Sequence, residues 1–389
     1  STLVVPFCLR RVTAGQSEEI ISGSMLLAIM ISSLLAVSSR AFRSGLRNRV
    51  SHSSGKLTVS RCAMLGTQAS SYGRVASPRF FALTAMALST SALHATSSGT
   101  VNIMTTTQPK EVFRKDYSIL PFDVSDIFLS FQLDAENTVV KTSFKIIRRK
   151  DSDLINDLVM DGEDLKLVSI KVNGELLTPG TFSTDGEELR IAASSLPADK
   201  SFEIETVVSI SPEKNLQLSG LYASNGMLCT QCEALGFRRI TYMFDRPDIM
   251  ASYKVYMEGD EKQYPVLLSN GNRIDSGKKE GGRHWAMWED PFPKPSYLFA
   301  VVAGDLGSTH DTYVTSSGRK VELGIYCDHE NANKLDHAMY SIKESMKWDE
   351  DVFGLECDLD MYNIVAVNDF NMGAMENKGL NVFNSALTL

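Results

Sequence analysis

Short runs of apolar–polar alternation are the most constraining feature of this chain, and they extend over residues 110–306. In the run 137–149, every second side chain from Val140 to Ile146 falls on one face, with mostly polar side chains between them. The run 201–211 alternates in the same way. A period of two is typical of β-strands that bury one side, so this part of the chain is predicted to consist of strands.

Three Asn-Gly pairs lie between such runs and predict tight turns, because both residues tolerate a positive φ. They are Asn173-Gly174, Asn225-Gly226 and Asn270-Gly271. Further strand-like runs follow at 253–258, 266–269, 284–288 and 297–303. Many short strands at this spacing predict a mainly β fold, an antiparallel β-sandwich or saddle, as an N-terminal domain over residues 109–306.

The pattern changes after residue 307. Residues 320–327 and 362–367 are predicted strands. Between them, apolar residues recur at helical spacing from Leu335 to Met346, with Asn331 or Asn333 as a candidate cap and Gly354 as the end of the helix. A strand, a helix and a second strand predict the incomplete start of an α/β domain over residues 307–389.

Residues 1–108 have the character of a leader. The stretch 20–39 is uncharged and mostly apolar, which suits a signal or anchor helix. No Asp or Glu occurs between Glu19 and Glu111, and arginine and serine are frequent there, as in transit peptides. We expect targeting to the secretory pathway, followed in one interpretation by import into an organelle. The alternative is a protein held in the membrane by a single span at 20–39, with its Arg-rich side facing the cytoplasm.

Charge argues against one class of partner, and the cysteine pattern argues against a metal or redox site. Residues 1–110 carry a formal charge of +9 and the rest of the 389-residue chain carries −17. An acidic folded part argues against nucleic acid as a partner. Cys229 and Cys232 form a C-x-x-C, but no second ligand pair accompanies them, so two buried thiols are a better interpretation than a metal or redox site. The oligomeric state has no sequence signal.

One loop-like stretch, 368–381, is rich in Gly and Asn and follows a predicted strand. Its glycines permit close approach of another backbone. Within it, residues 373–377 spell G-A-M-E-N, and the glutamate is Glu376. Taken alone, a single glutamate in a loop is usually only solvated.

The motif G-A-M-E-N resembles the exopeptidase signature of the gluzincin zinc aminopeptidases of the aminopeptidase N type. Residues 231–234, Q-C-E-A, resemble the other amine-binding segment of that family, and residues 242–248 resemble its Y-x-x-D-R-P-D element. The three matches occur in the family's order, and the resemblance covers about residues 110–389. It implies that the 307–389 domain is the start of a thermolysin-like catalytic domain.

The resemblance also implies roles for individual residues in binding peptide N-termini. Glu233 and Glu376 would hold the substrate's free α-amine, with Gln231 beside them. The backbone of Gly373 and Ala374 would pair with the first peptide unit of the substrate, like an added strand. The resemblance also implies that Met372, Met375 and Asn377 belong to the substrate-binding residues. Met372 would form a flexible wall of the first side-chain pocket; the alternative is an ordinary core methionine.

Catalysis in this family needs zinc held by H-E-x-x-H and a further Glu. The only His-Glu pair is His329-Glu330, and Asn333 stands where the second histidine is needed. The resemblance implies that the zinc motif, with its catalytic Glu, and the Tyr that stabilises the tetrahedral intermediate would lie beyond Leu389. We therefore expect zinc in the complete enzyme but no catalytic residue and no metal ligand within this chain.

Two interpretations of the chain follow. In the first, it is a fragment of an active aminopeptidase and is expected to be inactive alone. The alternative is a naturally short, non-catalytic relative that binds peptide N-termini or another chain. A plain β-sandwich adhesion module accounts for neither Glu233 nor Glu376.

Overall fold

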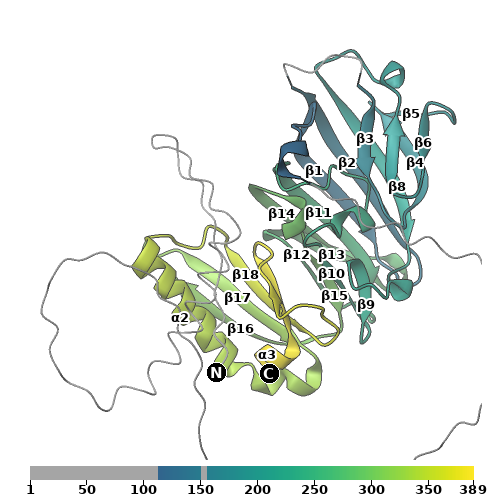
Figure 1. The fold of residues 1–389 in the computed structure, drawn as a ribbon. Helices are drawn as coiled ribbons and strands as arrows, with labels where there is room; N and C mark the ends of the chain where they lie inside the picture. The colour runs from purple at the N-terminus through teal and green to yellow at the C-terminus, as the bar shows by residue number, and fades with distance from the viewer. Residues whose placement is uncertain (1–112, 150–155) are drawn as a thin grey trace, which may run out of the picture. The chain divides into compact units, whose positions relative to one another are not determined.

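The computed structural model describes residues 113–149 and 156–389 (Figure 1). The expected leader, with its apolar stretch 20–39, lies outside the described residues. Within the described ranges, no helix combines the length and the apolar character that crossing a membrane requires.

A large sheet of eight strands forms most of the β-rich part (Figure 1). Its spatial order is β13-β14-β11-β1-β2-β8-β4-β5, and all neighbouring pairs are antiparallel except β1 and β11, which are parallel. The strands are β1 (Phe122–Gln132), β2 (Thr138–Arg148), β4 (Lys166–Val172), β5 (Glu175–Leu176), β8 (Ser201–Ile210), β11 (Ala251–Asp260), β13 (Asn272–Lys279) and β14 (Arg283–Lys294).

Two smaller sheets accompany it. The three-stranded sheet has the order β3 (Leu158–Asp161), β7 (Glu188–Ile191), β6 (Phe182–Thr184). The four-stranded sheet has the order β12 (Val266–Ser269), β15 (Val301–Gly304), β10 (Met227–Gln231), β9 (Gly220–Ser224). Buried apolar side chains from all three sheets belong to one hydrophobic cluster, so the sheets share a core. This confirms the mainly β, antiparallel architecture.

The apolar–polar alternation in the sequence matches the buried and exposed faces of the strands. On β2, Val140, Phe144 and Ile146 are buried, while Lys141 and Lys145 are exposed. The strand β8 buries every second residue in the same way. Burial of the apolar face against the shared core is what selects this register, since a shift of one residue would turn the whole face to water.

Two of the three Asn-Gly turns are hairpins. Asn173-Gly174 joins β4 to β5 and Asn225-Gly226 joins β9 to β10, and all four residues have positive φ. The third differs, because Asn270-Gly271 connects β12 to β13, which lie in different sheets. The Asn270 side chain is buried and bonds three backbone groups, so this pair is a junction between sheets and not a hairpin turn.

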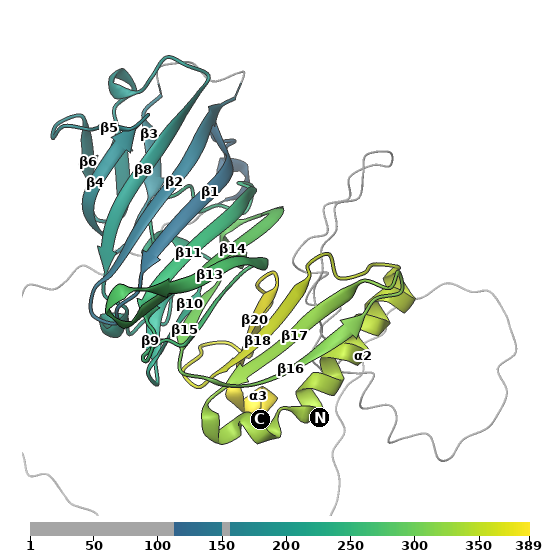
Figure 2. The same ribbon diagram turned by 180° about the vertical axis from the view of Figure 1, so that it is seen from behind.

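The C-terminal part is an α/β unit. Its sheet has the order β16 (Gly307–Val314), β17 (Lys320–Cys327), β18 (Met361–Val367), β20 (Leu380–Asn384), β19 (Ala374–Met375). The three central strands are parallel, and the two edge strands are antiparallel to their neighbours. Helix α2 (Asp336–Phe353) packs on one face of this sheet (Figure 2). Alternate residues of β18 enter the cluster under α2 and the cluster of the β-rich part, so both faces are buried and the strand is apolar apart from Asn363.

The helix α2 ends as expected but begins differently. Gly354 has φ 65° and terminates it. Neither Asn331 nor Asn333 caps its start, since both lie in a preceding 3₁₀ turn and no side chain bonds the first helical N–H groups. The 3₁₀ turns are η2 (Arg114–Asp116), η3 (Ala193–Ser195), η4 (Pro212–Lys214), η5 (Phe237–Arg239), η6 (Glu280–Gly282), η7 (Ser296–Leu298) and η8 (His329–Lys334).

A short helix, α3 (Ser385–Thr388), follows β20. Asn384 caps its start, because its side chain accepts a hydrogen bond from the Ala386 N–H at 3.0 Å. Leu389 is its C-cap, and the Leu389 N–H bonds the Ser385 carbonyl at 3.0 Å. Leu389 thus has a local role in the backbone of this turn.

Candidate functional site

The first expected amine-binding segment begins at the end of a central strand. β10 lies between β9 and β15, and Gln231 is its last residue. Gln231 and Cys232 are buried, whereas Glu233 is exposed. The chain turns back at once, with the Gly236 N–H bonded to the Cys232 carbonyl at 2.8 Å. A Cβ on Gly236 would overlap the Gln231 carbonyl oxygen, so only glycine permits this turn.

The second segment lies between β18 and β20. It contains β19, the edge strand of the five-stranded sheet, with Ala374 and Met375 paired to β20 on one side only. The Gly373 carbonyl accepts a hydrogen bond from the Asn384 N–H at 2.9 Å. Glu376 follows β19 directly and is half-buried. The backbone of this short strand is thus held on the β20 side, while its other edge pairs with no strand among the described residues.

The structure brings the two segments together. The Gln231 Nε2 donates to the Met372 sulfur at 3.1 Å. Although Glu233 is exposed as a residue, neighbouring protein atoms partly desolvate its carboxyl group; this desolvation, and then the negative charge of Glu376, raise the pKa of Glu233 above its usual value. The pKa of Tyr297 is also raised, by burial and then by the charges of Glu376 and Glu233. These influences place the two carboxylates near each other and near the Tyr297 hydroxyl.

No described side chain neutralises these two carboxylates. Neither Glu233 nor Glu376 makes an ion pair or a side-chain hydrogen bond within residues 113–149 and 156–389. Lys378, two residues from Glu376, is buried and bonds both oxygens of Asp358 at 2.8 and 2.9 Å. Two like charges that converge without a cation form a site suited to an ammonium group.

The other expected site residues fall into two groups. Met372 is 40% exposed, so it is not a core methionine. Gln231 keeps a buried Oε1 that has no partner among the described residues and is an acceptor beside the carboxylates. Met375 and Asn377 are buried, so neither presents its side chain at the surface of the site.

The Y-x-x-D-R-P-D element has a structural role near the site. The buried Asp245 accepts hydrogen bonds from the Ser296 Oγ at 2.6 Å and from the Arg238 Nε at 3.1 Å. Ser296 begins η7, the turn that carries Tyr297. Tyr297 itself was not among the expected residues, because a single tyrosine outside a motif carries no signal in the sequence.

We expect Glu233→Gln to stabilise the fold at neutral pH. A raised pKa means that the folded state ionises Glu233 less readily than the unfolded state, so wild-type stability falls as pH rises from the unfolded value of about 4.5 through the higher folded value. The variant lacks this loss, and its advantage should disappear at acidic pH where both carboxyl groups are protonated.

Thermal unfolding of the two proteins across pH measures this difference. Glu175→Gln, an exposed position on β5, is the matched control and should leave the pH profile unchanged. A Glu233→Gln variant with the same stability as the wild type at every pH would show that Glu233 is neither desolvated in the fold nor repelled by Glu376.

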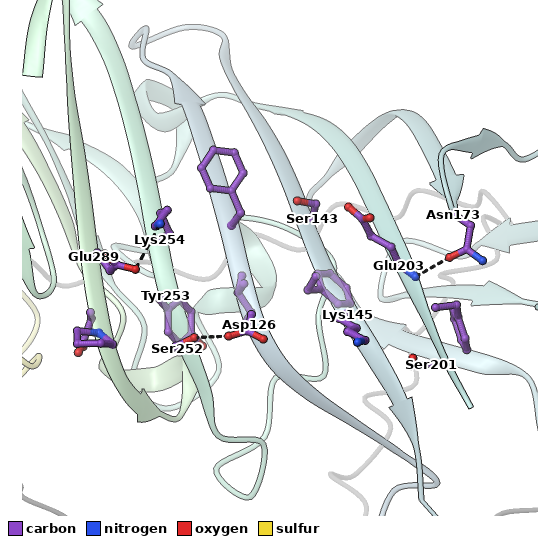
Figure 3. A pocket seen from close by; sticks show the side chains of 16 residues that line it. Asp126, Ser143, Lys145, Asn173, Ser201, Glu203, Ser252, Tyr253, Lys254 and Glu289 are labelled. Atoms are coloured by element: carbon purple, nitrogen blue, oxygen red, sulfur yellow. Dashed lines mark hydrogen bonds and ion pairs between the residues drawn. The ribbon is translucent and has the colours of Figure 1, made fainter. Parts of the chain in front are cut away.

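A separate hollow of about 710 Å³ lies on the outer face of the large sheet, lined from β1, β2, β8, β11 and β14 (Figure 3). Two pairs of its polar side chains interact with each other. The Ser252 Oγ donates to Asp126 at 2.7 Å, and Lys254 lies 3.3 Å from Glu289. None of the expected substrate-binding residues lines it, so it is distinct from the site that contains Glu233 and Glu376, called the carboxylate site below.

The thiols and the acidic groups of the described residues do not make a metal site. Cys229 and Cys232 are buried and unbridged, and burial raises the pKa of Cys229 to about 12 and that of Cys232 well above its usual value. Thiols this hard to ionise are neither reactive nor good ligands. In the part of the chain that the structure describes, no three His, Cys, Asp or Glu side chains gather as a metal site requires.

Known proteins resemble most of this chain. The Peptidase M1 N-terminal domain matches residues 115–298, and the Peptidase family M1 domain matches residues 337–389. Aminopeptidase N of Haemophilus influenzae is 52% identical over 280 residues, which are 72% of this chain and 32% of that protein. Aminopeptidase N of Escherichia coli is 51% identical over 284 residues, which are 73% of this chain and 32% of that protein.

A solved structure agrees with these relatives. The crystal structure of Legionella pneumophila aminopeptidase A in complex with aspartic acid matches with a TM-score of 0.66 and 36% identity, covering 70% of this chain and 32% of that chain. The match thus spans about a third of the length of these relatives. From the matching domains and these identities, this chain belongs to the peptidase M1 family, the gluzincin aminopeptidases of the aminopeptidase N type.

Proposed function

We propose that this chain recognises the free α-amine of peptides, as the substrate-anchoring part of a zinc aminopeptidase that removes N-terminal residues. The observation that carries the proposal is the convergence of Glu233 and Glu376 without a neutralising cation among the described residues. An ammonium group between them would relieve their repulsion and restore the charge balance of the site.

This arrangement selects chain ends over internal peptide bonds. An internal peptide unit offers no cation, so binding it would bury two carboxylates that remain unpaired. Sites built to bond a particular polar group reject analogues that lack it by about 10⁴–10⁵. The unpartnered Oε1 of Gln231 adds an acceptor for an N–H of the same amine.

The edge strand β19 supports a second contact with substrate. Because β20 occupies only one side of Ala374, the other side of this backbone can pair with an extended peptide, as in strand addition. Such pairing would direct the first side chain toward Met372, whose thioether adapts to varied shapes. The Legionella pneumophila aminopeptidase A structure is a complex with aspartic acid, an amino acid that has a free α-amine.

Zinc is the cofactor that the family resemblance implies for the complete enzyme, where it would activate water for attack on the peptide carbonyl. The residues described up to Leu389 do not fit such a site, so none is assigned to it. No described residue is assigned as the catalytic Glu or as the Tyr that stabilises the tetrahedral intermediate. The contribution proposed for this chain is to bind and orient the substrate and to exclude peptides without a free amine.

Metal content and hydrolysis test the proposal together. Protein expressed from the complete reading frame is expected to hold zinc stoichiometrically and to hydrolyse aminoacyl reporters, while the 389-residue chain alone is expected to do neither. Tightly held zinc in the 389-residue chain would contradict the assignment of residues. A complete protein that binds free amines without hydrolysis would instead support the non-catalytic alternative.

A further inference from the structure

The recognition loop, residues Asn368–Gly373, connects β18 to β19 and carries Met372 and Gly373. Most of its residues are exposed, yet hydrogen bonds from outside the loop hold it along its length. The Asn384 Nδ2 donates to the Phe370 carbonyl at 3.2 Å, and the Asn371 Nδ2 donates to the Gln217 carbonyl at 3.1 Å. An exposed loop with this many external bonds is fixed by its neighbours and not by its own packing.

Asp369 receives the densest set of these bonds, and all of them come from β9. The Tyr222 hydroxyl donates to the Asp369 carbonyl at 2.9 Å. The Ser224 Oγ donates to the Asp369 carboxylate at 2.8 Å and accepts from the Asp369 N–H at 3.3 Å. The peptide groups on both sides of the Asp369 Cα are therefore held by two side chains, which we call the β9 clamp.

The β9 clamp is built into a rigid element. Tyr222 and Ser224 are two residues apart, so their side chains leave the strand on the same side. Their relative exposures are 0% and 2%. β9 pairs along its whole length with β10, and Tyr222 lies opposite Cys229. The tight turn at Asn225-Gly226 connects the two strands.

The same hairpin also carries the first amine-binding segment, because β10 ends at Gln231 and Glu233 follows. One strand of the hairpin thus supplies the residues beside the amine, and the other strand holds the recognition loop. A displacement of the loop would change the distance between these two halves of the site.

We propose that Tyr222 and Ser224 are positioning residues that set where Met372 and Gly373 stand relative to Glu233, and thereby the selection of the substrate's first side chain. This inference rests on the proposed function. The reason is geometric. Met372 lies three residues after Asp369, so release of the Asp369 peptide unit would let Met372 move. The backbone just before Glu376 would stay paired with β20.

The test uses the double variant Tyr222→Phe/Ser224→Ala in the protein from the complete reading frame. We measure kcat/KM for a leucyl and an alanyl reporter. Loss of the clamp is expected to change the leucyl-to-alanyl ratio about tenfold, since a shift of the wall affects a large side chain more than a small one. Hydrogen exchange at the amides of 369–373 should accelerate in parallel.

The control variant is Tyr253→Phe/Ser341→Ala. Tyr253 is as buried as Tyr222, but its hydroxyl has no hydrogen-bond partner among the described residues, and the Ser341 hydroxyl bonds only its own helix. This control should leave the ratio unchanged. The single variant Ser224→Ala removes only a hydroxyl and provides a smaller perturbation if the double variant folds poorly.

Three outcomes separate the inference from the function on which it rests. A ratio within about twofold of the wild type, in a wild type that requires a free amine, overturns the clamp and leaves the proposed function standing. An equal fall for both reporters together with a lower Tm means that the clamp serves stability alone, which also overturns it. A wild type that cleaves acetylated and free substrates alike defeats the proposed function, and the inference with it.

Discussion

Acetylation of the substrate's α-amine is expected to lower kcat/KM by about 10⁴-fold in the complete enzyme. The acetylated nitrogen carries no charge, so Glu233 and Glu376 would face it as two unpaired carboxylates with their mutual repulsion intact. The measurement compares the same reporter with free and acetylated amine at neutral pH.

A reporter with an N-methylated amine is the control for added bulk. It keeps the positive charge and should lose much less activity than the acetylated reporter, because the charge pairing survives. Brisk cleavage of the acetylated reporter would contradict recognition of the chain end.

The substitution Glu376→Gln should lower kcat/KM on an aminoacyl reporter by about 10²–10³-fold, since removal of one partner from a desolvated charge pair costs about 2–5 kcal/mol. Glutamine keeps the size of the side chain, so the loss reports charge. Glu376 also follows β19 without contributing to the hydrophobic core, and the variant is expected to fold normally.

Glu344→Gln is the matched control, since Glu344 is exposed on α2 and takes no part in the carboxylate site. Its kinetics should equal those of the wild type. Unchanged kcat/KM for Glu376→Gln would remove Glu376 from the site, whatever the result for Glu233.

The parts of the fold that sequence predicted are those where local pattern and burial agree. The faces of β2 and β8 follow directly from alternation, because each strand buries one side in a shared core. Asn270-Gly271 shows the limit of local rules: its turn chemistry suits a hairpin, but the side chain of Asn270 is used to bond two other segments. The parallel pairing of β1 with β11 is likewise set by long-range contacts.

Some residues of the candidate site could be predicted from the sequence, and others could not. The residues within motifs, such as Glu233 and Glu376, were found by resemblance, but their convergence depends on how the β9–β10 hairpin meets the recognition loop. Tyr297 and the β9 clamp lie outside the quoted motifs. Their contribution comes from position in the fold, which a single sequence does not encode locally.

The dependence of amine selectivity on Glu376 tests the central claim most directly. The ratio of kcat/KM for free and acetylated reporters is measured in the wild type and in Glu376→Gln. If the carboxylate pair recognises the ammonium group, the ratio should fall by at least about tenfold in the variant, because the free substrate loses an interaction that the acetylated substrate never had. A ratio that stays the same in both proteins would show that Glu376 does not bind the amine.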